Sequence, residues 1–274
     1  LNHLTLNGSL NLIRQPFDDL SYVKSSNDRA IAVASNSTQG SGLLEIDLKK
    51  GLFTHMPMSN FKLDESYISK GEEISFKGYL GKKTYAWYYP PIENKKGPLL
   101  VKSHSGPTAM ASKGLDWTIQ FWTSRGWGVV DVNYGGSTGF GREYRDRLKS
   151  NWGLVDVYDC ELAALSLISR GEVDEDMIAI EGSSAGGFTT LSCLCMGNTF
   201  KVGACRYGVS DLQSLALETH RFEKGYFDYL LGSFDKNREI YKLRSPLNHP
   251  DLIKCPVIFF QGLKDNVVPP DQTE

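Results

Sequence analysis

Residues 177–196, MIAIEGSSAGGFTTLSCLCM, constrain the fold more than any other part of the chain. They open with four apolar residues, turn through glycines and serines, and continue with small and apolar residues at helical spacing. Gly182, Ser184 and Gly186 give the turn a G-x-S-x-G pattern, and Gly187 follows. A serine on so sharp a strand-to-helix turn needs neighbours without a Cβ, so that its Oγ can stand clear of the sheet. The stretch therefore predicts a nucleophile elbow with Ser184 as the nucleophile.

The helix predicted after this turn has a chemical consequence. Its N-terminus points at the reacting carbon, and the backbone N–H of Ala185 is free to stabilise a developing oxyanion. The five-residue pattern alone also fits a plain glycine- and serine-rich turn that closes a buried strand. The strand before it and the helix after it favour the elbow.

Strands alternate with helical stretches from residue 66 onward, which indicates a mostly parallel, doubly wound α/β sheet with helices on both faces. Residues 210–248 form a polar and aromatic excursion between two of the strands. Ligand chemistry in such a sheet belongs at the carboxyl ends of the strands. The predicted strands are 72–77, 84–89, 99–103, 128–132, 177–180, 201–205 and 256–260, and helices are predicted at 115–124 and 154–169.

Residues 1–62 have a different pattern. Short strand-like runs at 20–24, 30–35 and 42–48 are separated by turns rich in Ser, Asn, Asp and Gly, which is typical of an antiparallel sheet. Three or four such strands amount to one β-propeller blade, and one blade cannot bury both of its faces. We therefore expect a β segment over 1–62, either the last blade of a larger propeller or a small β cap, and an α/β domain over 63–274.

The composition argues against several classes of function. Thirty Lys and Arg against 32 Asp and Glu give a net charge of −2, which offers no attraction for nucleic acid or an anionic membrane. No apolar run approaches the ~20 residues of a membrane-spanning helix, and residues 1–19 lack a secretion signal, so a cytoplasmic location is expected. The five cysteines are odd in number and scattered through apolar segments, which predicts free thiols and neither a metal nor a cofactor.

Polar residues follow three of the predicted strands. Asp265 comes after the last one, where it is either a plain turn aspartate or the carboxylate of a catalytic triad, and its order after Ser184 favours the triad. His104 precedes Ser184, where this kind of fold does not place its general base, so we interpret it as a loop-stabilising residue. The hydroxyl of Tyr134, after the strand at 128–132, is either an oxyanion donor or part of an ordinary packed aromatic.

Taken together, five motifs resemble the catalytic domain of the prolyl oligopeptidase family. The resemblance spans about residues 66–274 and is nearest to the acylaminoacyl-peptidase and dipeptidyl-aminopeptidase branch. It implies an α/β-hydrolase fold and an N-terminal β-propeller that covers the active site. The motifs are residues 103–107, 133–144, 152–159, 182–187 and 262–269.

The resemblance also implies roles for individual residues. Ser184 is the nucleophile, and Asp265 orients a histidine. The oxyanion hole is formed by the N–H of Ala185 and the hydroxyl of Tyr134. The excursion at residues 210–248 lines the substrate pocket, and Phe222, Tyr226 and Phe227 are its candidate residues for substrate specificity.

One feature departs from the family pattern. The family's catalytic histidine follows the aspartate by some tens of residues, and none of the five histidines here stands after Asp265. We therefore expect a general base beyond Glu274 in a longer protein, and little activity from this chain alone. The complete protein is expected to be a serine peptidase that hydrolyses short peptides, aminoacyl or acyl-aminoacyl substrates through an acyl-enzyme. A carboxylesterase and a non-catalytic peptide-binding module are the alternatives, and homo-oligomerisation is left open.

Overall fold

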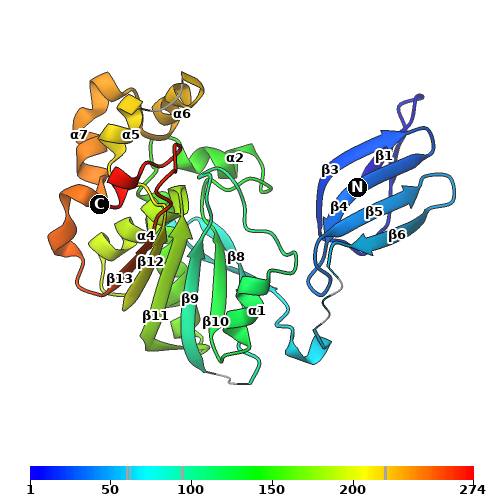
Figure 1. Ribbon diagram of the computed structural model, residues 1–274, viewed down its shortest axis with the longest axis horizontal. Coiled ribbons are helices and arrows are strands. Elements are labelled where there is room, and N and C mark those ends of the chain that lie inside the picture. The colour runs from blue at the N-terminus through cyan, green and yellow to red at the C-terminus, as the bar shows by residue number, and fades with distance from the viewer. Residues whose placement is uncertain (60, 62, 94–95, 219–220) are drawn as a thin grey trace.

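The computed structural model describes residues 1–59, 61, 63–93, 96–218 and 221–274, with the side chains of 218 and 221–224 outside the description. A seven-stranded mixed sheet in the order β13-β12-β11-β9-β10-β8-β7 organises the larger part (Figure 1). Strands β9 to β13 pair in parallel, whereas β7 and β8 are antiparallel, which confirms the mostly parallel α/β fold. The strands are β7 (Glu72–Lys77), β8 (Lys83–Tyr89), β9 (Gly97–Ser103), β10 (Gly128–Asn133), β11 (Val173–Ser183), β12 (Val202–Arg206) and β13 (Val257–Phe260).

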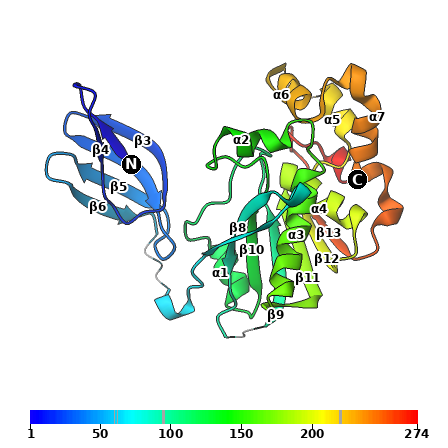
Figure 2. The ribbon, with the colours of Figure 1, turned by 180° about the vertical axis from the view of Figure 1, so that it is seen from behind.

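Helices cover both faces of this sheet, which Figures 1 and 2 show from opposite sides. Ile119 of α1 packs on Val129 and Ala179 in a small core on one face, and α3 and α4 pack over the main core on the other. No helix in the described ranges is long and apolar enough to cross a membrane. The helices are α1 (Trp117–Thr123), α2 (Arg142–Arg145), α3 (Val155–Ser169), α4 (Ala185–Met196), α5 (Leu212–Glu218), α6 (Arg221–Leu231) and α7 (Phe234–Arg244).

Most element boundaries differ from the sequence expectation by one or two residues, and the starts of α1 and β11 differ for identifiable reasons. Helix α1 begins at Trp117 rather than at residue 115, because the Asp116 side chain caps it by accepting the Thr118 N–H at 2.7 Å. Strand β11 begins at Val173 rather than at residue 177. Its first half carries the acidic run 174–176, in which Glu175 and Asp176 are exposed, so an apolar pattern could not reveal it.

The excursion at 210–248 folds into α5, α6 and α7, which lie together near the C-terminal loop in Figure 1. Leu212, Leu230 and Tyr241 are fully buried and join the main core. The hydroxyl of Ser245 accepts the Leu212 N–H at 2.9 Å, which ties the end of α7 to the start of α5. The excursion is therefore packed against the α/β part rather than being a polar surface loop.

The N-terminal part contains two antiparallel sheets. One pairs β1 (Asn2–Leu4) with β2 (Leu10–Leu12). The other has the order β3-β4-β5-β6, and its buried face carries Ala34, Leu44 and Ile46. Its opposite face leaves Leu43 and Met56 exposed, as expected for one blade without a neighbour. The strands are β3 (Asp19–Ser26), β4 (Arg29–Ser35), β5 (Gly42–Asp47) and β6 (Leu52–Pro57). The boundary at residue 62 stays a prediction.

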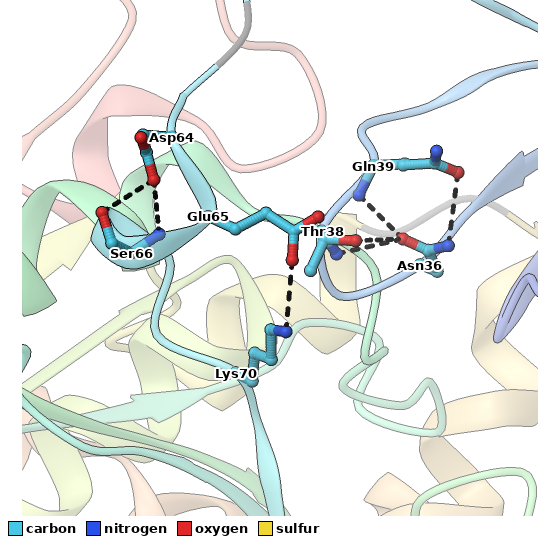
Figure 3. A network of polar contacts seen from close by, with 7 residues as sticks. All are labelled: Asn36, Thr38, Gln39, Asp64, Glu65, Ser66 and Lys70. Carbon is cyan, nitrogen blue, oxygen red and sulfur yellow. Dashed lines mark hydrogen bonds and ion pairs between the residues drawn. The ribbon is translucent and has the colours of Figure 1, made fainter.

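Short-range polar contacts join side chains within residues 64–70, which precede β7 (Figure 3). Asp64 accepts hydrogen bonds from the N–H and the hydroxyl of Ser66, at 2.9 and 2.7 Å, and so caps a 3₁₀ turn. Glu65 pairs with Lys70 at 3.4 Å. The charged side chains of this pair are largely exposed, so the pair contributes little to stability.

A turn between β4 and β5 contacts the α/β part directly. The Asn36 side chain accepts the N–H groups of Thr38 and Gln39, at 3.0 and 2.7 Å, which closes the turn (Figure 3). The Asn36 carbonyl accepts the Leu115 N–H at 2.8 Å, immediately before α1. The cap of α1 at Asp116 is thus next to the point where the two parts meet.

Strand β13 forms one edge of the seven-stranded sheet and pairs only with β12 among the described strands. Its side chains Ile258, Phe259 and Phe260 are 52%, 43% and 48% exposed. Parallel strands are ordinarily covered on both faces, so β13 presents an uncovered apolar edge. This edge lies just before the loop that carries Asp265.

Candidate active site

Ser184 occupies the turn between β11 and α4, as the glycine and serine pattern predicts. Its backbone has φ 52° and ψ −122°, a left-handed conformation that costs a non-glycine residue about 1–3 kcal/mol. The Ser184 N–H donates to the Arg206 carbonyl and its carbonyl accepts the Phe188 N–H, both at 3.1 Å. Strand β12 and helix α4 therefore hold the strained residue in place, and this geometry is that of a nucleophile elbow.

The glycines around Ser184 are required by close backbone approaches. A Cβ at Gly182 would overlap the carbonyl of Gly186, and a Cβ at Gly186 would overlap the carbonyl of Ser103 at the end of β9. A Cβ at Gly187 would lie 2.5 Å from the Cα of Gly208. The glycines thus let the elbow pack directly against the backbones of two neighbouring loops.

Ser184 opens into a cavity of about 70 Å³ at the carboxyl ends of the strands. Most of the side chains that line it are apolar, and the loop after β13 closes one side with Val267 and Val268. Tyr226 and Phe227 of α6, two of the three predicted pocket residues, lie in its lining, whereas the Phe222 side chain lies outside the described residues. The sequence did not indicate the rest of the lining, which includes Trp152, Val209, Leu215, Leu230, Val267 and Val268.

Two backbone N–H groups border this cavity without a partner. Ala185 is the first residue of α4, where a helix leaves its N–H unpaired, and Gly106 lies in the loop after β9. Neither N–H donates to any group in the part of the chain that the structure describes. Ser105 Oγ donates to the Ser183 carbonyl at 2.6 Å, which ties the loop to the elbow. Unpaired N–H groups at these two places form the oxyanion hole in nucleophile-elbow enzymes, so Ala185 and Gly106 are candidate oxyanion donors.

His104 orients the peptide unit that carries the Gly106 N–H. Its Nδ1 lies 2.8 Å from the Ser105 carbonyl oxygen, and its Nε2 lies 2.7 Å from Ser137 Oγ. The Ser105 carbonyl and the Gly106 N–H belong to one planar trans peptide, so fixing the oxygen fixes the direction of the N–H. Burial lowers the pKa of His104 to about 4, so the imidazole is neutral at pH 7. These contacts confirm a loop-stabilising His104.

Tyr134, the second predicted oxyanion donor, contacts the loop after β9, and its catalytic role stays a prediction. Tyr134 is fully buried, and its ring stacks on the His104 imidazole with centroids 4.1 Å apart. Its hydroxyl donates to the carbonyl oxygens of Pro107 and His104, at 2.9 and 3.1 Å. A phenol has one proton to donate, and here that proton is used within the loop. The geometry therefore gives no support to Tyr134 as a direct oxyanion donor. The sequence could place its loop, but it could not predict the direction of the Tyr134 ring.

Asp265 lies in the loop after β13, two strands along the sheet from β11, in the position predicted for it. Its Oδ1 accepts the N–H groups of Val267 and Val268, at 2.9 and 3.0 Å, and both valines line the Ser184 cavity. Its Oδ2 accepts no hydrogen bond within the described part of the chain. None of the residues that line the cavity is a histidine.

Metal and thiol chemistry have no visible support at this site. Within the described ranges, no three His, Cys, Asp or Glu side chains gather closely enough to hold a metal ion. All five cysteines are free, and burial raises the pKa of Cys195 and of Cys205 to about 11. Their thiolates are therefore unfavourable at neutral pH.

The sheet order and the serine elbow together define the α/β-hydrolase class. The chain belongs to the prolyl oligopeptidase family, whose model matches residues 113–274. It is 31% identical to the dipeptidyl aminopeptidase BIII of Pseudoxanthomonas mexicana over 174 residues, which is 61% of this chain and 25% of that protein. It is also 31% identical to the acylamino-acid-releasing enzyme 1 of Oryza sativa subsp. japonica over 184 residues, 63% of this chain and 24% of that enzyme.

A solved structure resembles nearly the whole chain. The puromycin-hydrolysing peptidase of Mycobacterium tuberculosis superposes with a TM-score of 0.93 at 36% identity, over 97% of this chain and 42% of that one. The chain therefore spans about a quarter of the length of the two curated relatives and less than half of the solved peptidase. The superposition includes the N-terminal sheets as well as the α/β part.

Proposed function

We propose that this chain carries the nucleophile of a serine peptidase that hydrolyses short peptides, aminoacyl or acyl-aminoacyl substrates. The observation that carries the proposal is Ser184, strained on its elbow and opening into an apolar cavity beside the unpaired N–H of Ala185. The names of the relatives, an aminopeptidase and an acylamino-acid-releasing enzyme, support amide rather than ester substrates.

The proposed reaction proceeds through an acyl-enzyme. Ser184 Oγ attacks the scissile carbonyl carbon while a histidine accepts its proton. The N–H groups of Ala185 and Gly106 then stabilise the negatively charged oxygen of the tetrahedral intermediate. Collapse of the intermediate breaks the C–N bond, and the leaving amine takes the proton from the histidine. Water, activated by the same histidine, releases the acyl group and restores the serine.

Asp265 is proposed to orient that histidine. Its Oδ1 is fixed by two backbone N–H groups, which leaves Oδ2 available for an imidazole Nδ1–H. We propose that the histidine belongs to a segment of the longer protein beyond residue 274. The uncovered edge of β13, directly before the Asp265 loop, supports a further segment packed there.

Hydrolysis of aminoacyl and acyl-aminoacyl p-nitroanilides by the full-length protein tests the proposal. Ser184→Ala is expected to lower kcat by about 10⁴-fold or more, because no nucleophile remains. Ser192→Ala is the matched control, since the Ser192 hydroxyl lies buried in the same helix without a hydrogen-bond partner in the described residues. Full activity in Ser184→Ala would show that the nucleophile lies elsewhere.

The same assay separates the alternatives. A carboxylesterase would turn over matched esters but leave the anilides intact, because amides need leaving-group protonation that esters do not. A non-catalytic binding module would bind peptides without product formation and would not be labelled at Ser184 by a fluorophosphonate. Labelling at Ser184 together with anilide turnover supports the peptidase.

A further inference from the structure

The loop that carries the Gly106 N–H is held from two opposite sides. On the sheet side, Tyr134 binds the carbonyls of His104 and Pro107. On the cavity side, the Tyr226 hydroxyl accepts the Thr108 N–H at 3.1 Å and lies 2.7 Å from Thr108 Oγ1. Thr108 is only two residues from Gly106, so both tyrosines act on the same short turn.

The two tyrosines differ in what else they contact. Tyr134 is fully buried in the loop after β10 and does not line the Ser184 cavity. Tyr226 is on α6, and its side chain lines the cavity together with Phe227 and Leu215. A substrate side chain that fills the cavity therefore touches Tyr226, but not Tyr134.

We propose that Tyr226 is a positioning residue that couples the occupied substrate cavity to the oxyanion loop through its hydrogen bonds to Thr108. A side chain packed in the cavity restricts the Tyr226 ring, and the hydroxyl then holds Thr108 and the adjacent Gly106 N–H in the geometry that the oxyanion requires. The coupling rests on the proposed function, because it assigns the Gly106 N–H to a reacting oxyanion.

The coupling predicts that the cavity acts on kcat as well as on binding. An empty cavity, as with a glycine side chain, leaves Tyr226 less restrained, so its hydroxyl contributes less to the loop. A leucine side chain fits the apolar lining and restrains the ring through direct contact. The wild-type enzyme should therefore have a higher kcat for leucine substrates than for glycine substrates, whether or not their KM values differ.

The test compares leucine and glycine anilides with the full-length enzyme and its Tyr226→Phe variant. The phenylalanine keeps the ring in the cavity and removes only the hydroxyl, so KM for the leucine substrate should change by less than about twofold. We expect kcat to fall by about 10-fold for leucine and by less than about twofold for glycine. A peptide boronic acid with a leucine side chain mimics the tetrahedral intermediate, and Tyr226→Phe should bind it about 10-fold more weakly than the wild-type enzyme does.

Tyr229→Phe is the matched control. Tyr229 is on the same helix, but its hydroxyl donates to Asp146 at 2.9 Å and does not line the cavity. Tyr229→Phe should keep the wild-type ratio of kcat for the leucine anilide to kcat for the glycine anilide. Hydrogen exchange of the 104–109 segment gives a second readout, and it should become faster in Tyr226→Phe but not in Tyr229→Phe.

The outcomes separate this coupling from the function on which it rests. Equal losses of kcat for leucine and glycine, or an equal effect in Tyr229→Phe, would overturn the coupling while leaving the peptidase intact. Unchanged exchange in the 104–109 segment would also overturn it, since the hydroxyl would then not hold the loop. Absence of Ser184-dependent turnover in the wild-type enzyme would instead count against the proposed function.

Discussion

Asp156 accepts a 2.5 Å hydrogen bond from the Thr189 hydroxyl, and this contact joins α3 to the first turns of α4, just beyond Ser184. The other carboxylate oxygen of Asp156 accepts the Gly153 N–H at 2.7 Å. The carboxyl is fully buried, so these two bonds compensate for its removal from water. The helix that presents the nucleophile is therefore anchored by a titratable group.

Asp156→Asn is expected to lower the free energy of unfolding by about 1–3 kcal/mol, because an amide cannot accept both hydrogen bonds. Burial raises the pKa of Asp156 to about 6, so between about pH 4 and 6 the folded state binds its proton more tightly than the unfolded chain. The stability contributed by that proton is present at low pH and is lost as the pH rises through about 6. The deficit of Asp156→Asn should therefore be larger near pH 4 than near pH 7. Urea unfolding of both proteins at both pH values measures this difference in free energy of unfolding. A difference that grows with pH would contradict a raised pKa of Asp156 in the folded state.

Gly186→Ala should remove most activity of the full-length protein, because its Cβ would overlap the Ser103 carbonyl and force the elbow away from β9. We expect kcat to fall by at least about 100-fold, as for a displacement of about 1 Å at the reacting atoms. Gly225→Ala in α6 is the control, since its Cβ would meet open space. That change should stabilise the helix by about 0.5–1 kcal/mol. Kinetics and thermal unfolding of the two variants would distinguish crowding at the elbow from a general glycine effect.

Asp265→Asn should lower kcat by about 10³–10⁴-fold, because an amide cannot stabilise the imidazolium that forms during catalysis. The loop should persist, because the asparagine oxygen can still accept the N–H groups of Val267 and Val268. Asp271→Asn, six residues further on and exposed, should leave kcat unchanged. Anilide kinetics across pH 5–9 in all three proteins checks the role, and an active Asp265→Asn would remove Asp265 from the triad.

Phe227→Leu should enlarge the cavity beside Ser184 and shift specificity toward larger side chains. We expect the ratio of kcat/KM for phenylalanine over leucine substrates to rise by about 10-fold, roughly the value of one or two methylene groups in an apolar pocket. Phe234→Leu in α7 is the control, because Phe234 packs edge-to-face on Tyr241, with ring centroids 5.1 Å apart, and does not line the cavity. An unchanged ratio in Phe227→Leu would place the substrate side chain elsewhere.

Sequence alone predicts the features that depend on local chemistry. The glycines at 182, 186 and 187 could be interpreted because close backbone approach excludes a Cβ wherever the chain turns so sharply. Asp265 was predictable because its place after the last apolar strand fixes its place in the sheet. The parallel sheet followed from the alternation of apolar runs and helical spacing.

The features that sequence could not predict depend on contacts between distant segments. The Tyr134 ring stacks on the His104 imidazole, which lies 30 residues earlier in the chain, in the loop after another strand. The hydrogen bond between Thr108 and Tyr226 joins segments 118 residues apart, with no local pattern to signal it. Apart from Tyr226 and Phe227, the cavity lining could not be predicted, because ordinary valines and leucines in separate elements line it only after folding.

The uncovered strand β13 has a practical consequence for handling the protein. An exposed apolar edge strand is a template for pairing with another chain, so the 274-residue polypeptide alone should tend to aggregate when concentrated. Expression of the longer protein proposed above should increase the soluble, monodisperse fraction. An expression boundary placed well beyond this strand is therefore the better starting point for crystals or cryogenic imaging.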